Sequence, residues 1–90
     1  MSLIDSHAHL DFYSETPGDL EAVLARAHAA SVNTILAIGI GDGPDTMHRA
    51  LEIAHLHPHI FASVGIHPQE AASATPAALA KLTDLAADHK

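Results

Sequence analysis

The sequence predicts an α/β fold in which three parallel strands alternate with three helices. Three short apolar segments have the length and composition of buried strands, and each is followed by apolar residues at helical spacing. The successive strand–helix units are about 30 residues long, and such alternation is typical of a parallel sheet with right-handed crossovers.

The predicted strands cover residues 3–9, 34–40 and 60–66. The second contains the run Ile35, Leu36, Ala37 and Ile38, which is apolar on both faces. Strands of this kind belong to parallel sheets that helices cover. The first strand differs, because its second half carries polar residues.

Each predicted helix opens with a proline, at Pro17, Pro44 and Pro76. Proline suits the first helical position, since an N–H group there has no partner within the helix. Thr16 and Thr75 precede two of these prolines and can cap the free amides. The apolar faces expected to pack on the sheet are Leu20, Val23, Leu24 and Ala27 in the first helix, Met47, Ala50, Leu51 and Ala54 in the second, and Leu79, Leu82 and Ala86 in the third.

Residues 1–90 are expected to form one α/β unit that is smaller than a complete fold of this class. A (β/α)₈ barrel is built from units of this size but needs about 250 residues. On that reading the chain corresponds to about three of the eight units of a TIM-type barrel. The alternative, an open doubly wound sheet, usually has five or six strands. Such an incomplete sheet has two unpaired edges, which favour self-association or pairing with a complementing chain.

Composition narrows the classes of function. The formal net charge of −7 argues against a broad basic surface for nucleic acid or membrane. A phosphate substrate remains compatible with this charge, because bound metal ions invert the local field. The absence of cysteine excludes disulfides and thiolate metal ligands. No signal peptide or membrane-spanning run is recognisable, so we expect a cytoplasmic protein with no membrane partner.

The motif His7-Ala8-His9 is the strongest local indication of chemistry. Side chains of a strand alternate between its faces, so both imidazoles are expected on one face, together with Asp5. Two imidazoles placed in this way can bind one divalent ion at about 2.1 Å. The alternative, that these are two ordinary histidines near a strand end, stays open. The opposite face, including Ile4 and Ala8, is expected to pack on helices.

Asp5 and His67 are the other candidate site residues. A carboxylate within a sheet is costly unless it is paired, so we expect Asp5 to hydrogen-bond a ligand imidazole or lie close to the metal. His67 follows the third predicted strand and would lie at the same edge of the sheet as His7 and His9. A turn residue without a functional role is the alternative for His67. We interpret residues 39–43 as a turn, and His55, His57 and His59 as surface residues that could bind metal adventitiously. The remaining histidines are assigned no role.

Two motifs together resemble the TatD-like metal-dependent DNases. Residues 4–11 read Ile-Asp-Ser-His-Ala-His-Leu-Asp, and residues 64–68 read Val-Gly-Ile-His-Pro. The first motif also opens amidohydrolases and PHP-type phosphatases, and the second favours TatD. The resemblance covers essentially the whole chain and identifies it as the N-terminal portion of such an enzyme.

The resemblance implies a TIM barrel that hydrolyses phosphodiester bonds in DNA, in the manner of an exonuclease, with two divalent metal ions such as Zn, Mn or Mg. It implies that His7 and His9 are ligands of one ion and that His67 contacts the substrate, which is DNA or a small phosphoester. The glutamate that bridges the metals in the family follows on a fourth strand, which these 90 residues lack. No catalytic residue can therefore be assigned here, and we expect the isolated chain to be inactive.

Two other functions remain open from the sequence. One is a different enzyme of the same architecture, namely an amidohydrolase or a PHP-type phosphatase. The other is a non-catalytic metal-binding fragment that reuses these strands. The first hypothesis places the chain in a longer protein or a split enzyme, whereas the last requires it to fold and bind metal alone.

Overall fold

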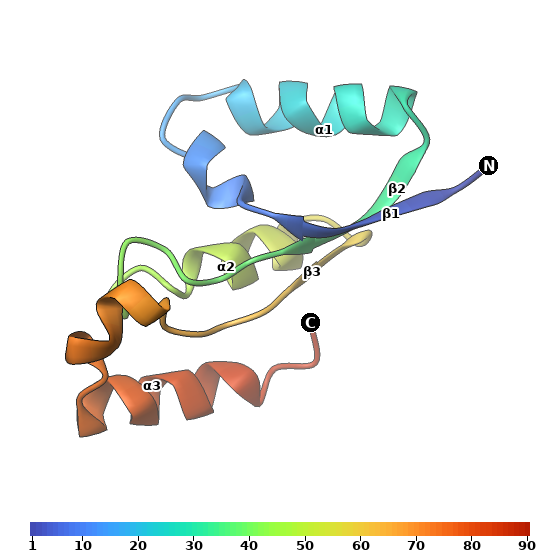
Figure 1. Cartoon of the computed structure of the whole chain (residues 1–90). Helices are drawn as coiled ribbons and strands as arrows, with labels where there is room; N and C mark the ends of the chain where they lie inside the picture. The colour runs from blue at the N-terminus through green and yellow to red at the C-terminus, as the bar shows by residue number, and fades with distance from the viewer.

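The computed structural model describes residues 1–90 and contains one parallel sheet with strand order β1-β2-β3 (Figure 1). The strands are β1 (Leu3–Ala8), β2 (Val32–Ala37) and β3 (Ile60–Ala62). The helices α1 (Asp19–Ala29), α2 (Arg49–Leu56) and α3 (Pro76–Ala86) follow them in turn. The predicted fold class is confirmed: three strand–helix units alternate as they do in a TIM-type barrel.

Two 3₁₀ helices that the sequence pattern did not predict follow the first and third strands. They are η1 (Leu10–Tyr13), directly after β1, and η2 (Pro68–Ser73), after β3. The third strand is shorter than the predicted range 60–66, since it ends at Ala62. Both 3₁₀ helices therefore lie at the carboxyl ends of strands, where the candidate site residues are found.

One helix begins where the sequence predicts it, and two begin later. Thr75 caps α3, because its Oγ1 accepts a hydrogen bond from the Ala78 N–H at 3.1 Å. The prediction for α1 was wrong by two residues, since the chain first turns at Gly18 in the left-handed conformation (φ 89°) and the helix begins at Asp19. Local turn geometry thus overrides the helix-starting tendency of Pro17.

The prediction for α2 was also wrong, because the residues after Pro44 form turns. The hydroxyl of Thr46 accepts a hydrogen bond from the Asp42 N–H at 2.7 Å and donates one to the Gly43 carbonyl at 3.3 Å. Such bonds offer the backbone an alternative to helix. The helix consequently begins at Arg49, although Met47 is fully buried as expected of the apolar face.

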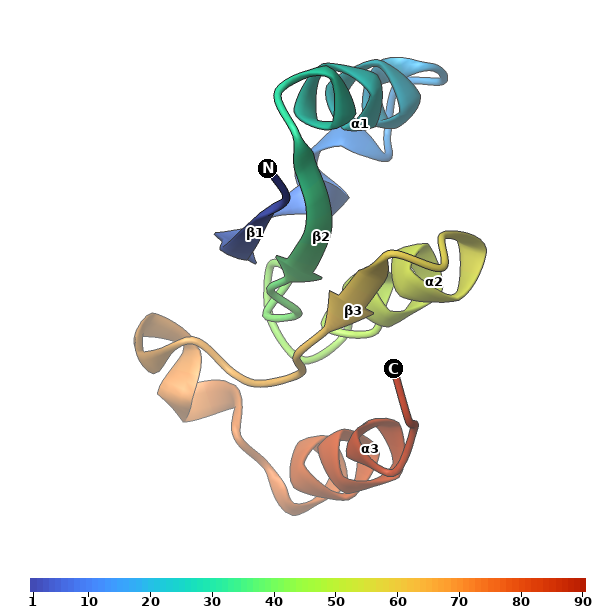
Figure 2. The same cartoon turned by 90° about the vertical axis from the view of Figure 1, so that its right-hand side faces the viewer.

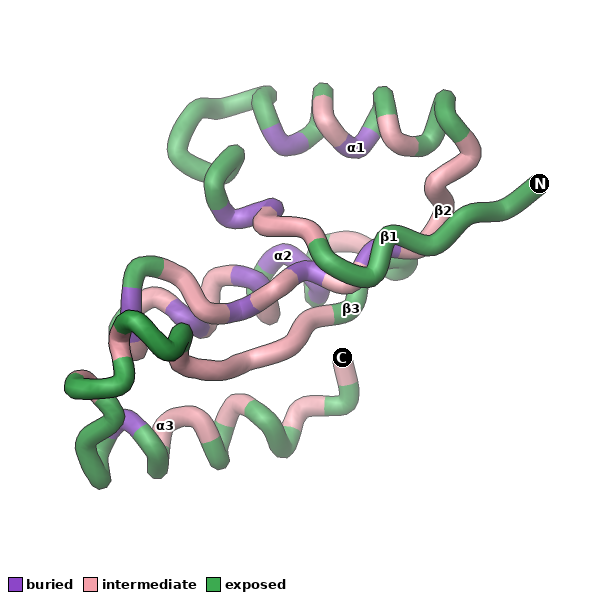
Figure 3. Tube along the Cα trace, in the orientation of Figure 1, coloured by how far each residue is buried: buried purple, intermediate pink, exposed green.

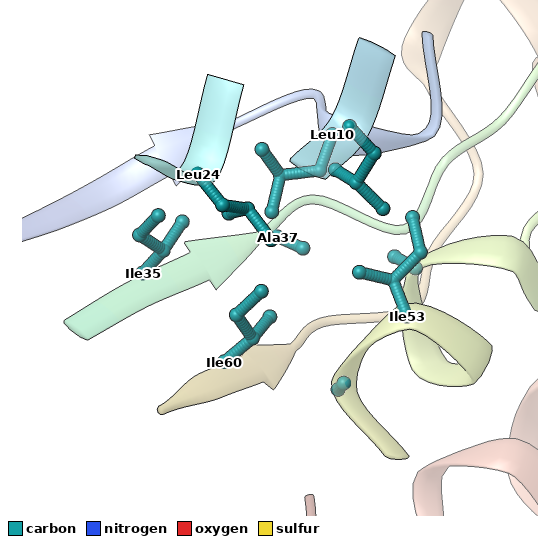
Figure 4. Packing of buried hydrophobic residues seen from close by; sticks show 9 residues of the cluster. Leu10, Leu24, Ile35, Ala37, Ile53 and Ile60 are labelled. Atoms are coloured by element: carbon teal, nitrogen blue, oxygen red, sulfur yellow. The ribbon is translucent and has the colours of Figure 1, made fainter. Parts of the chain in front are cut away.

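The core lies between one face of the sheet and the helices α1 and α2 (Figures 2 and 4). Ile35 and Ala37 project from the same face of β2 and belong to one cluster with residues of both helices. Both helices therefore cover the same face of the sheet, as the helices of a barrel do. The cluster consists of Leu10, Leu20, Leu24, Ile35, Ala37, Ala50, Ile53, Ala54 and Ile60.

The third helix packs least against the rest of the chain (Figure 3). Its buried residue is Ala78, whereas Leu79, which we expected on the packed face, is 49% exposed. The chain returns to the sheet after this helix, where the carbonyl of Lys90 accepts a hydrogen bond from the Ala62 N–H at 3.1 Å. None of the helices has the length and apolar character needed to cross a membrane.

The predicted faces of β1 are wrong for its first half. Asp5 pairs with the core residue Ile35, so Asp5 faces the helices, and Ile4, which is 72% exposed, faces away from them. The pairing register shifts by one residue between Asp5 and Ala8. A shift of one residue exchanges the two faces, so that Ala8 packs against the core while the histidines leave regular alternation.

Candidate metal centre

His7 and His9 lie next to each other despite the shifted register. Their ring centres are 5.1 Å apart and their ring planes are inclined by 70°. Two imidazoles that share one tetrahedral ion at about 2.1 Å have ring centres about 5 Å apart. The spacing therefore fits a pair of nitrogen ligands for one divalent ion. His7 is exposed and His9 is partly exposed, so the pair is accessible from solvent.

Asp5 stabilises the backbone of the segment that carries this pair. Its Oδ1 accepts a hydrogen bond from the N–H of His7 at 3.0 Å. We expected a bond to a ligand imidazole, and the structure instead shows one to the backbone. The carboxylate thus fixes the irregular segment of β1 that presents the histidines, where the ladder to β2 is interrupted.

One cavity of about 430 Å³ is lined by Asp5, His7 and His9 together. Its remaining walls are mainly apolar and come from η1, α1 and β2. A mostly apolar cavity with a few converging polar groups has the usual character of a ligand site. The other lining residues are Ala8, Leu10, Phe12, Tyr13, Val23, Ala27, Val32 and Ile35.

The sequence analysis assigned no role to Phe12, whose ring stacks on that of His9. The ring centres of Phe12 and His9 are 5.3 Å apart, and the planes deviate by 14°. The contact depends on η1, because residues three apart lie above one another in a 3₁₀ helix. The only indication in the sequence was the presence of an aromatic residue three positions after a candidate ligand.

His67 lies in a different cavity from the other candidate residues. This cavity of about 320 Å³ is lined by His67, Asp42, Glu70 and three neighbours. β1 and β3 are both parallel to β2, so His67 still lies at the same edge of the sheet as His9. The Nδ1 atom of His67 accepts a hydrogen bond from the Gln69 N–H at 3.0 Å. In the neutral ring, the proton is therefore on Nε2.

The other histidines gather at the opposite edge of the sheet or on helices. His55 Nε2 lies 2.7 Å from Asp88 Oδ2, and the rings of His57 and His59 form a second pair with centres 6.0 Å apart. Nowhere in the structure do three or more histidine or carboxylate side chains converge on a point suited to a metal ion. The His7–His9 pair can therefore supply two ligands to a metal ion, and no third side chain completes the site in this structure.

Comparison with known proteins places the chain in a family. The family model described as TatD related DNase matches residues 4–90. The chain is also 39% identical over 88 residues to the protein named uncharacterized metal-dependent hydrolase YabD from Bacillus subtilis (strain 168). That match covers 98% of this chain and 33% of the relative, so the chain spans about a third of the relative's length. The match over residues 4–90, which includes the histidine pair and His67, shows that the chain belongs to the TatD related DNase family.

Proposed function

We propose that this chain supplies the first metal ligands of a metal-dependent hydrolase that cleaves phosphodiester bonds in DNA or in small phosphoesters. The observation that carries the proposal is the 5.1 Å spacing of the His7 and His9 rings at the carboxyl end of β1. Active sites of barrel enzymes form at this end of the strands. The relative in Bacillus subtilis, named a metal-dependent hydrolase, supports the class of reaction.

Each residue of the site has a separable part in this function. His7 and His9 would hold one divalent ion of Zn, Mn or Mg, in a complete site of two ions. A divalent ion in such a site acidifies bound water and offsets charge that develops on phosphate. Asp5 keeps the backbone of His7 in place through the 3.0 Å hydrogen bond. Two imidazoles are fewer than the three protein ligands of catalytic zinc sites, so we expect no turnover from these residues alone.

His67 is proposed as a contact for the phosphate group. Since its Nδ1 accepts the Gln69 N–H, its Nε2 is left as a donor to an oxygen of the substrate. Asp42 and Glu70 line the same cavity and oppose a bare phosphate through their negative charge. A phosphate whose charge is partly offset by a divalent ion suits this surrounding better. We therefore expect His67 to bind phosphate only when metal is present.

Zinc binding can be tested by NMR of the nine imidazoles, which resolves the candidate pair from the others. We expect zinc to shift the His7 and His9 signals together. Either His7→Gln or His9→Gln should lower the zinc affinity at least about tenfold. His28→Gln on α1 is the matched control and should leave it unchanged. A wild-type chain in which zinc shifts only His55, His57 or His59 would contradict the proposal.

The substrate class needs a second measurement on the zinc-loaded chain. A dinucleotide should shift the His67 signals with zinc and not without it, whereas a dipeptide amide should leave them unchanged. An equal response to the amide would favour the amidohydrolase alternative. Zinc binding with no response to either compound would favour a non-catalytic metal-binding role.

A further inference from the structure

Phe12 occupies a place that burial does not explain. The chain has only two phenylalanines and one tyrosine, and Phe12 is 67% exposed. Although its neighbour Leu10 belongs to the hydrophobic core, Phe12 does not. The ring of Phe12 instead contacts the ring of the candidate ligand His9.

The Phe12 ring contacts the His9 ring, which in turn contacts the His7 ring, and all three residues line the cavity. Phe12 stacks on His9 with the ring planes 14° apart, and the His9 and His7 rings are inclined to each other by 70°. The backbone sets the first contact, since the Phe12 N–H donates to the His9 carbonyl at 3.3 Å within the 3₁₀ turn. The stack is therefore built by η1, before any ion binds.

We propose that Phe12 is a positioning residue, which holds the His9 imidazole in the orientation needed to bind the divalent ion together with His7. This inference rests on the proposed function of the histidine pair. A side chain that is ordered beforehand loses less conformational freedom on binding, and this gain corresponds to about threefold to tenfold in affinity. Metal binding also makes the imidazole more positive, which strengthens its attraction to the face of an aromatic ring.

The test is a zinc titration of the full chain, followed through the ring protons of His9 by NMR. In the wild type, the Phe12 ring should shift these protons upfield even without metal. Phe12→Leu retains an apolar side chain but abolishes the stack. We expect this variant to lose the upfield shift and to bind zinc about threefold to tenfold more weakly. Phe12→Tyr retains the aromatic face and should restore both properties.

Phe61→Leu is the matched control, because Phe61 is a 42% exposed residue of β3 that lies outside the cavity and has no ring contact with either histidine. It should leave the His9 protons and the zinc affinity unchanged. A Phe12→Leu variant that binds zinc as tightly as the wild type would overturn the positioning role and leave the proposed function intact. A wild type whose His7 and His9 do not respond to zinc would overturn the proposed function, and the inference with it.

Discussion

Gly39 lies where β2 leaves the sheet, and it is enclosed by the backbone of two other segments. A methyl group added at this position would collide with the carbonyl oxygen of Ser63 and approach that of Met47 to 3.0 Å. The Gly39 N–H donates to Ser63 Oγ at 3.3 Å, and its carbonyl accepts from the Gly65 N–H at 3.0 Å. The position therefore requires glycine for close approach of backbone, which keeps the ends of β2 and β3 together.

Gly39→Ala should lower the free energy of unfolding by about 2 kcal/mol, because backbone atoms cannot yield as a flexible side chain would. Gly65→Ala is the matched control, since a Cβ at Gly65 meets no atom within 4 Å. Urea unfolding followed by circular dichroism measures both changes. Equal effects of the two substitutions would show that the crowding at Gly39 does not limit stability.

The sequence indicated the histidine pair but not the way in which its residues are held. The two imidazoles are neighbours because they are separated by a single residue, and this holds even though the register shift disturbs the alternation. Phe12 and Asp5 act through an unpredicted 3₁₀ turn and through a backbone hydrogen bond. Periodicity describes which face a side chain occupies, so it carries no information about either contact.

At the level of elements, the order of strands and helices was predictable, and their boundaries were only partly so. The second and third strands are recognisable because each is a short apolar run, and the helices because of their apolar spacing. The start of α2 was missed because the Thr46 hydroxyl bonds to the backbone of the preceding turn. The start of α3 was found because Thr75 and Pro76 act there with no competing turn.

Thr75→Ala should destabilise α3 selectively, since it removes the hydrogen bond from the Ala78 N–H to Thr75 Oγ1. The expected loss is about 1 kcal/mol, which corresponds to about fivefold faster amide exchange in this helix. Exchange should change little in α1 and α2, because α3 packs weakly on them.

Thr83→Ala on the same helix provides the control. Its hydroxyl donates to the Leu79 carbonyl at 3.0 Å, a bond that adds little to a helix in which alanine is the better residue. Faster exchange throughout the molecule after Thr75→Ala would mean that α3 unfolds together with the core rather than separately.

On the scale of the whole molecule, the end of the chain compensates for the weak packing of α3. The radius of gyration is 13.6 Å, compared with about 12 Å for a compact domain of this length. Asp88 joins the end of α3 to α2 through the 2.7 Å contact with His55, and its other oxygen accepts the Lys90 N–H at 2.8 Å. The Lys90 carbonyl in turn accepts the Ala62 N–H from β3. The Asp88 carboxylate thus links the end of α3 to α2 directly and to β3 through Lys90.

This link should depend on pH. The hydrogen bond from the Lys90 backbone, followed by that from the His55 side chain, lowers the pKa of Asp88 from its ordinary value of 3.8. The folded chain then binds this proton less readily than the unfolded chain, so the stabilisation is complete above that ordinary value and is lost as the pH falls through the lowered pKa. The imidazoles of His55 and His89 are the titratable neighbours of this carboxylate.

Amide exchange of Ala62, measured by NMR from about pH 6 to about pH 2.5, reports this link directly. After correction for the intrinsic rate, protection in the wild type should fall below about pH 4, because protonation of Asp88 weakens the bonds that hold Lys90 beside β3. Asp88→Asn should give weaker protection with a flatter dependence on pH, since the amide cannot ionise. Asp84→Asn, on the exposed side of α3, should retain the wild-type profile. A wild-type profile in the Asp88→Asn variant would show instead that other carboxylates govern the acid sensitivity of the sheet edge.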